Sequence, residues 1–163
     1  MLNTYTLIKR IITGILLFSF IFLGFLDGIT QGQKTYSSVM GLDISRVYFY
    51  TFFLLTIGCW LLYNKWFVGI GFLALAAFNN YFIEYLLIHN YVASILIYIG
   101  IITDIIVRHK FKWLIPLAIV GIIQGLAFQT TLLSFYAVGL MEFSALCIGS
   151  IFIIKYLDME KNN

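Results

Sequence analysis

Six long apolar runs, separated by short polar or basic turns, occupy most of this chain and constrain its fold more than any other feature. A helix needs about 20 mostly apolar residues to cross roughly 30 Å of bilayer hydrocarbon. We therefore predict an all-α fold, a polytopic membrane helix bundle with six transmembrane helices, in which residues 1–163 form a single membrane domain. The expected spans cover residues 11–26, 47–63, 66–87, 91–107, 113–128 and 131–154.

The composition excludes the soluble alternatives. The chain is 62% hydrophobic and 10% charged, whereas a soluble domain is typically about 45–50% apolar and about 25% charged. So few polar residues could not cover the surface of a soluble domain this small. The same numbers exclude a disordered chain and a disulfide scaffold.

The positions of the basic residues predict the orientation, because cytoplasmic loops of membrane proteins are enriched in lysine and arginine. With six spans the two termini share one side of the membrane. That side holds eight of the ten basic residues, namely Lys9, Arg10, Lys65, Arg108, Lys110, Lys112, Lys155 and Lys161. The opposite side holds Lys34 and Arg46. We predict a multi-pass protein of the inner (cytoplasmic) membrane with both termini inside, whose partner is the lipid bilayer and whose net charge of +3 requires no nucleic acid.

The longest connection, the outer loop 28–46, is expected to be either an entrance to the bundle or a mobile connection. Within it, Asp43 suits the N-cap of the second span. The sequence carries no metal-binding motif and no cofactor signature, so we predict neither a metal nor a cofactor.

Small residues at helical spacing indicate where helices pack in lipid. Gly121 and Gly125 form a G-x-x-x-G pattern on the fifth span, and Ala145 and Gly149 form a similar pattern on the sixth. We expect helices five and six to pack on each other, on a membrane protein partner or in a homo-oligomer. The three tryptophans lie near the inner span ends and are expected to form an aromatic belt; these are Trp60, Trp66 and Trp113.

Ionisable residues at membrane depth are costly and mark candidate sites. Glu142 lies near the middle of the sixth span, and Gln124 lies on the fifth span towards its outer end. One interpretation is a proton-titrating or ligand-binding group at Glu142. The other is a neutral hydrogen bond between Glu142 and Gln124 that only holds the two helices together.

A second polar stripe lies near the outer end of the third span. Asn80 and Glu84 are four residues apart and share a helix face, and His89 and Asn90 follow in the outer turn. This cluster would suit a cation, a headgroup or a small substrate, or it is merely a hydrated helix end. Asp104, in contrast, lies four residues before Arg108, and a structural ion pair explains it.

The segment 46–106 resembles a known family. The run Asn79-Asn80-Tyr-Phe-Ile-Glu84-Tyr-Leu-Leu-Ile-His89-Asn90-Tyr-Val is similar to the transmembrane region of vitamin K-dependent γ-carboxylases and of horizontally transferred transmembrane domain proteins. DoxX-type small membrane proteins share the same general shape. The resemblance implies a four-helix membrane fold with a polar outer pocket around Glu84, His89 and Asn90. It implies no carboxylase activity, because Tyr85 stands where those enzymes place a catalytic lysine beside the acidic residue.

Three functions are compatible with these patterns. The first is a transport or permease-type protein, or a subunit of one, that binds a small or amphipathic solute at Glu142 and Gln124, with the loop 28–46 as its outer gate. The second is a non-catalytic accessory or assembly factor whose buried polar groups only hold helices together. The third is a lipid- or quinone-modifying enzyme that uses Glu84 and His89 as an acid/base pair.

Overall fold

The computed structural model describes residues 4–32, 43–78, 94–129 and 135–157, and the side chains of Ser94, of 124–129 and of 135–142 lie outside that description. The described residues are helical and contain no strand, so the all-α prediction is confirmed for them. The helices are α1 (Thr4–Thr30), α3 (Ile44–Tyr63), α4 (Val68–Ala77), α5 (Ser94–Val107), α6 (Leu114–Gln129) and α7 (Phe135–Tyr156), with a 3₁₀ turn η3 (Phe111–Trp113) before α6.

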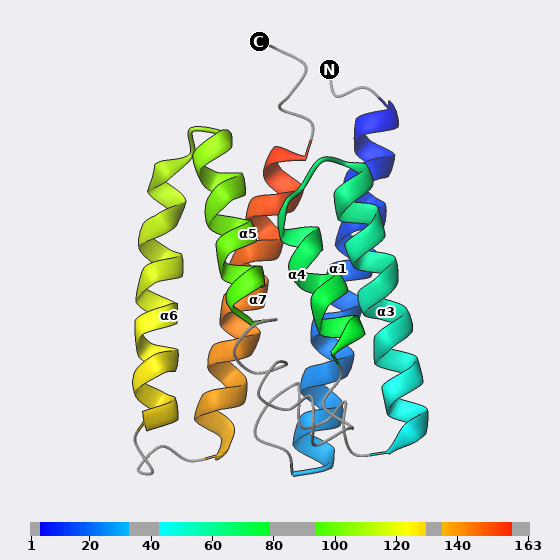
Figure 1. Ribbon diagram of the computed structural model, residues 1–163, viewed down its shortest axis with the longest axis vertical. Coiled ribbons are helices and arrows are strands. Elements are labelled where there is room, and N and C mark those ends of the chain that lie inside the picture. The colour runs from blue at the N-terminus through cyan, green and yellow to red at the C-terminus, as the bar shows by residue number, and fades with distance from the viewer. Residues whose placement is uncertain (1–3, 33–42, 79–93, 130–134, 158–163) are drawn as a thin grey trace.

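The helices form an antiparallel bundle whose two chain ends lie at the same end (Figure 1). Helix α1 packs against α3 and α7, α4 packs between α3 and α5, and α6 packs against α7. The turn between α3 and α4 and the turn between α5 and α6 lie at the end of the bundle that carries both termini (Figure 1). The predicted basic turns are therefore brought together at one end, which we call the basic end.

Helix α3 begins and ends through local contacts. Asp43 is the N-cap, as predicted, and its Oδ1 accepts a hydrogen bond from the Arg46 N–H at 2.9 Å. At the other end Asn64 is the C-cap, and its side-chain amide donates to the Trp60 carbonyl at 2.8 Å. Lys65 then adopts a left-handed backbone with φ of 59°, which turns the chain directly into α4.

Helix α4 ends at Ala77, ten residues before the end of the predicted apolar run. Its C-cap, Phe78, leaves helical geometry with φ of −111° and ψ of 66°. Two asparagines follow at once, and asparagine disfavours helix interiors because its side chain competes for backbone hydrogen bonds. The length of the apolar run alone predicted that the helix would continue past Phe78.

Glycines allow α3, α4 and α5 to approach closely. A Cβ built on Gly69 would lie 2.7 Å from the Gly58 carbonyl oxygen, and one built on Gly100 would lie 2.6 Å from the Val68 Cα. Packing through small residues is the expected mode for helices in lipid, but it involves different helices from those predicted. Gly121 meets only Tyr98, at 3.8 Å, and Gly149 has nothing within 4 Å among the described residues, although α6 and α7 do pack together.

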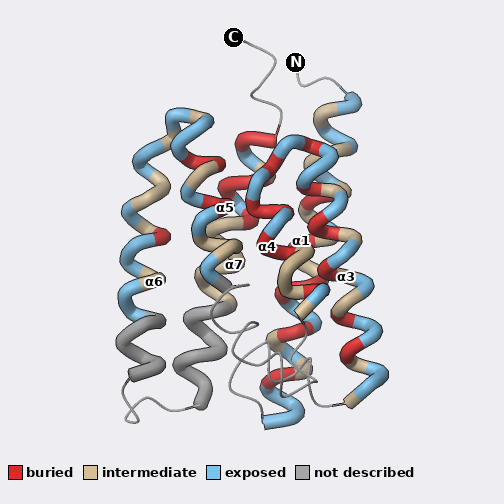
Figure 2. The backbone as a smooth tube through the Cα atoms, in the orientation of Figure 1, coloured by how far each residue is buried: buried red, intermediate tan, exposed pale blue. Residues whose placement is uncertain are grey.

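Many of the exposed residues of the described helices are apolar, whereas a few of the buried ones are polar. Figure 2 shows where the buried and the exposed residues lie along the bundle. Thr13 and Asp104 are 0% exposed, whereas Phe52 and Ile122 are 69% and 64% exposed. Exposed aliphatic and aromatic side chains of this kind continue along α1, α3, α5 and α6. Such a surface is costly in water and favourable in lipid.

Two of the described helices, Thr4–Thr30 and Ile44–Tyr63, are long and apolar enough to cross a membrane. The remaining apolar helices are shorter over the described residues. The all-helical bundle and these two helices indicate association with a membrane.

Candidate functional site

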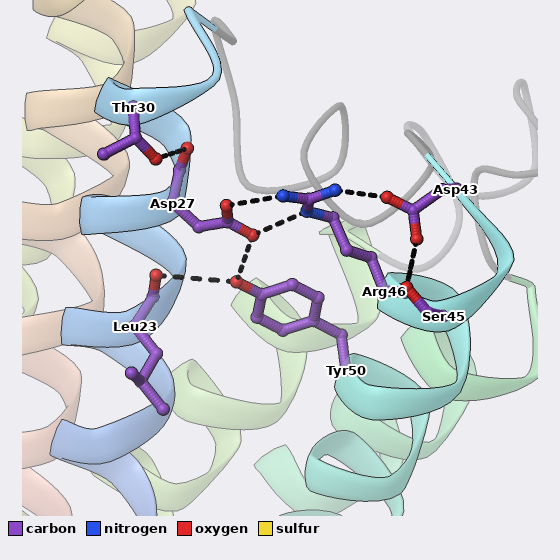
Figure 3. Close-up of polar contacts among 7 residues, drawn as sticks. All are labelled: Leu23, Asp27, Thr30, Asp43, Ser45, Arg46 and Tyr50. Atoms are coloured by element: carbon purple, nitrogen blue, oxygen red, sulfur yellow. Dashed lines mark hydrogen bonds and ion pairs between the residues drawn. The ribbon is translucent and has the colours of Figure 1, made fainter.

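An ion-pair network ties the end of α1 to the start of α3, at the end of the bundle opposite the basic end (Figure 3). Asp27, three residues before the end of α1, accepts hydrogen bonds from Arg46 on α3 with both oxygens, at 2.9 Å to Nε and 3.2 Å to Nη2. This bidentate geometry is the strong form of an arginine–carboxylate contact. The Arg46 Nη1 also pairs with Asp43, so one guanidinium bridges two carboxylates.

Tyr50 adds a phenol to this network. It is 3% exposed, and its hydroxyl donates to Asp27 Oδ2 at 3.1 Å (Figure 3). The network thus joins the last turn of α1 to the first two turns of α3, on either side of the loop that connects them. Each described carboxylate in it is paired with Arg46, so the arrangement acts as a structural clamp between the helices.

Asp43 has a perturbed pKa within this clamp. Hydrogen bonds from the Ser45 hydroxyl and from the Arg46 N–H, together with the charge of Arg46, lower its pKa to about 2. The carboxylate form is therefore the stable one at every physiological pH. Only its N-cap role was visible in the sequence.

Asp104 has a larger role than the predicted pair with Arg108. The pair exists, at 2.9 Å between Arg108 Nη1 and Asp104 Oδ1. In addition, the two carboxylate oxygens accept the backbone N–H groups of Phe67 and Val68, each at 3.0 Å. Asp104 on α5 therefore caps the N-terminus of α4, where unpaired N–H groups and the helix dipole favour a negative charge.

Arg108 completes this inner assembly. Its Nη2 donates to the Lys65 carbonyl at 3.1 Å, and its guanidinium lies 3.8 Å from the ring centroid of Trp66. Trp66 is 0% exposed and packs edge-on against Phe152. It is thus a core residue, and the prediction that it belongs to an interfacial belt is wrong, because the turn after α3 folds it inward under Arg108.

Helix α4 stops short of the end of the bundle opposite the basic end, which α1 and α3 reach (Figure 1). It has 10 residues, which correspond to about 15 Å of rise. Its first residue, Val68, lies against Gly100, and Gly71 lies against Ile97, so α4 packs on the middle of α5 rather than along its last turns. Both the start and the end of α4 therefore lie within the length of the bundle.

The sequence-predicted site residues are distributed as follows. Asn80, Glu84, His89 and Asn90 fall in 79–93, between the ends of α4 and α5 along the chain and outside the described residues. Gln124 and Glu142 lie on α6 and α7, which pack against each other, while their side chains lie outside the description. The proposed roles of all six residues stay predictions.

Within the described part of the chain, no group of three or more His, Cys, Asp or Glu side chains is placed to hold a metal ion. The two polar assemblies that the structure does describe, at Asp27 and at Asp104, are built from intramolecular partners. The pair between Asp104 and Arg108 was visible in the sequence. The contacts of Asp104 with the start of α4 and of Asp27 with Arg46 were not, because these partners are distant along the chain.

Comparison with known proteins gives no match to a family model, to a curated protein or to a solved structure. The resemblance of 46–106 to the carboxylase-type and DoxX-type proteins stays a prediction.

Proposed function

We propose that this protein crosses the inner membrane six times with both termini inside, and that it binds a small or amphipathic solute within the bundle as a transport or permease-type protein. The apolar exterior and the collected basic turns support the membrane topology. A fluorescent protein fused to the C-terminus is expected to fluoresce, and a periplasmic reporter at the same position to stay inactive. The reverse result would refute the orientation.

The observation that carries the solute-binding proposal is the interruption of α4. In transporters, short or broken membrane helices place their ends near the bilayer midplane, where the helix dipoles and freed backbone groups bind ions and substrates. Helix α4 ends at Ala77, about 15 Å from its start, so it is about half as long as a 30 Å membrane is thick. Its partly negative C-terminus lies short of the ends of α1 and α3 (Figure 1).

The predicted polar residues come next along the chain after the end of α4. Asn80 comes three residues after Ala77, and Glu84, His89 and Asn90 follow it. Glu142 on α7 would add a carboxylate within the bundle. In this proposal the C-terminus of the short helix α4 and the predicted polar stripe together make a hydrated site inside the bundle.

Thiol accessibility tests the site directly. In a background where Cys59 and Cys147 are serine, Asn80→Cys in intact cells should react with a membrane-impermeant thiol reagent added outside, because water reaches that depth. Ile70→Cys is the matched control, since Ile70 lies on α4, ten residues before Asn80, is 47% exposed on the bundle exterior and should stay in lipid. Equal labelling of the two variants would refute a hydrated site.

A flux assay tests the role of Glu142. Purified protein in vesicles that contain a pH-sensitive dye is driven by a potassium diffusion potential, and proton flux is recorded. We expect flux in the wild type and its loss in Glu142→Gln, with both proteins equally folded. Unchanged flux in the variant would remove the midplane carboxylate from the mechanism.

A second candidate function is that of a non-catalytic accessory factor, and it is favoured by the open surface at Gly149. Among the described residues nothing lies within 4 Å of a Cβ built there, so the small-residue side of α7 has room for another helix. This function predicts a stable co-purifying membrane partner or a homo-oligomer in mild detergent. A monomer without a partner would count against it.

A further inference from the structure

Two lysines at the basic end lie over the ring of one tyrosine at the C-terminus of α7, and a third lies in the neighbouring turn η3. The Lys110 Nζ lies 5.4 Å and the Lys155 Nζ 5.7 Å from the ring centroid of Tyr156. Lys112 is in η3, next to Trp113, whose Nε1 donates to the Tyr156 hydroxyl oxygen at 3.3 Å. The charges of Lys155, Lys112 and Lys110 all act on this hydroxyl. We call Lys110, Lys112, Lys155 and Tyr156 the lysine cluster.

The lysine cluster has positive charge without a matching carboxylate among the described residues. The ion pairs described in the chain involve Arg46 and Arg108, and the buried Asp104 is already held by Arg108. The Tyr156 hydroxyl accepts its hydrogen bond from Trp113, and its own proton has no acceptor within the described part of the structure. Tyr156 is 7% exposed, and its ring packs against Trp113 and Phe152, so the position of the phenol is fixed.

The positive charge of three neighbouring lysines and a tyrosine O–H that donates to no described acceptor match a phosphate group, which offers several acceptor oxygens and negative charge. The cluster lies where α6 begins and α7 ends, and both helices continue away from it with exposed isoleucines, among them Ile115 at 65% and Ile151 at 49%. A ligand that fits both features has an anionic head and apolar chains. Basic pockets between membrane helices on the cytoplasmic side bind such lipid headgroups.

We propose that the lysine cluster binds the headgroup of an anionic phospholipid in the inner leaflet, with the Tyr156 hydroxyl and the lysine ammonium groups donating to its phosphate. Trp113 fixes the orientation of the phenol through its Nε1 hydrogen bond and lies at the interface, as tryptophan commonly does. This inference rests on the proposed orientation, which places the basic end in the cytoplasm.

Native mass spectrometry of the full chain in mild detergent, with added phosphatidylglycerol or phosphatidylcholine, tests the proposal. Each of Lys110→Gln and Lys155→Gln should weaken phosphatidylglycerol binding about fivefold, which corresponds to about 1 kcal/mol per lysine at a membrane surface. Tyr156→Phe should weaken it in the same direction, while phosphatidylcholine binding stays unchanged in all variants. Lys9→Gln is the matched control, because Lys9 lies over a tyrosine ring at the same end, 4.7 Å from the Tyr5 centroid, but on α1.

Three outcomes would overturn the proposal: equal binding of the two lipids by the wild type, a loss in Lys9→Gln as large as in the cluster variants, or full competition by millimolar inorganic phosphate, which would indicate a site for a free anion. Resistance of the protein to alkaline carbonate extraction is measured in parallel. If alkaline carbonate extracts the protein from the membrane, the proposed membrane-spanning function itself is refuted. If the protein stays in the membrane and any of the three outcomes is found, only the lipid site is refuted.

Discussion

Replacing Asp104 tests whether this carboxylate holds α4, α5 and the connecting turn together. Asp104 is fully buried, and its oxygens accept from Phe67 N–H, Val68 N–H and Arg108 Nη1. Asp104→Leu removes all three bonds in one step. It leaves two N–H groups of α4 unpaired and leaves the Arg108 side chain, which is 6% exposed, without its counter-ion.

The expected loss of stability is large for a single substitution. Breaking a buried ion pair by removing one partner costs about 3–5 kcal/mol, and each N–H left unpaired in a buried position costs about 1–3 kcal/mol. Arg108 keeps its bond to the Lys65 carbonyl and its stacking on Trp66, which offsets part of the loss. We therefore expect Asp104→Leu to lower the free energy of unfolding by about 4 kcal/mol.

The assay is reversible unfolding in mixed micelles of mild detergent and dodecyl sulfate, followed by tryptophan fluorescence. Four proteins form a double-mutant cycle: the wild type, Asp104→Leu, Arg108→Met and the double variant. Removing both partners should cost less than Asp104→Leu alone, because no buried charge is then left unpaired. A loss below about 1 kcal/mol in Asp104→Leu, or strict additivity in the cycle, would refute the assigned role.

Three further predictions concern other contacts. Gly100→Ala should destabilise the bundle by about 1–3 kcal/mol through overpacking against the α4 backbone. Gly149→Ala has open space at its Cβ position among the described residues and should be neutral or slightly stabilising. Equal losses of stability in the same unfolding assay would contradict the close approach of α4 and α5. Tyr50→Phe should cost about 1 kcal/mol in the wild type and clearly less in an Asp27→Leu background, because the side chain at position 27 then has no acceptor for the phenol. Additive losses would show that the two side chains act independently. The pKa of Asp43 in the folded protein, about 2, is below its ordinary value of 3.8. Its stabilising contribution is therefore complete above about pH 4 and is lost as the pH falls towards 2. Asp43→Ser, which retains a cap, should reduce that acid-dependent loss in a pH series of unfolding curves, and an unchanged series would contradict this prediction.

Local contacts of this fold could be predicted from the sequence, because the two residues that make each contact lie within one or two helical turns of each other. The N-cap at Asp43 and the pair between Asp104 and Arg108 are of this kind, and both are confirmed. The apolar runs likewise predicted helices over most of the described residues.

Contacts between distant segments could not be predicted in the same way. Asp104 is 36 residues from Val68, and Arg46 is 19 residues from Asp27, so no spacing rule relates them. The G-x-x-x-G pattern directed attention to the fifth and sixth spans, but the closest glycine contacts join Gly58 with Gly69 and Gly100 with Val68. A run of apolar residues also carries no signal of where a helix stops, and the two asparagines after Phe78 are a stronger signal than length.

The cap that α5 provides for α4 has a consequence for the order in which the chain is assembled. During synthesis α4 leaves the ribosome before Asp104 exists, and the N–H groups of Phe67 and Val68 then lack the acceptor that the finished protein gives them. In hydrocarbon each unpaired group costs several kcal/mol, so the start of α4 is expected to remain in contact with water or the insertion machinery until α5 arrives. On this basis we expect α4 and α5 to enter the membrane as one unit, because the carboxylate that caps α4 belongs to α5.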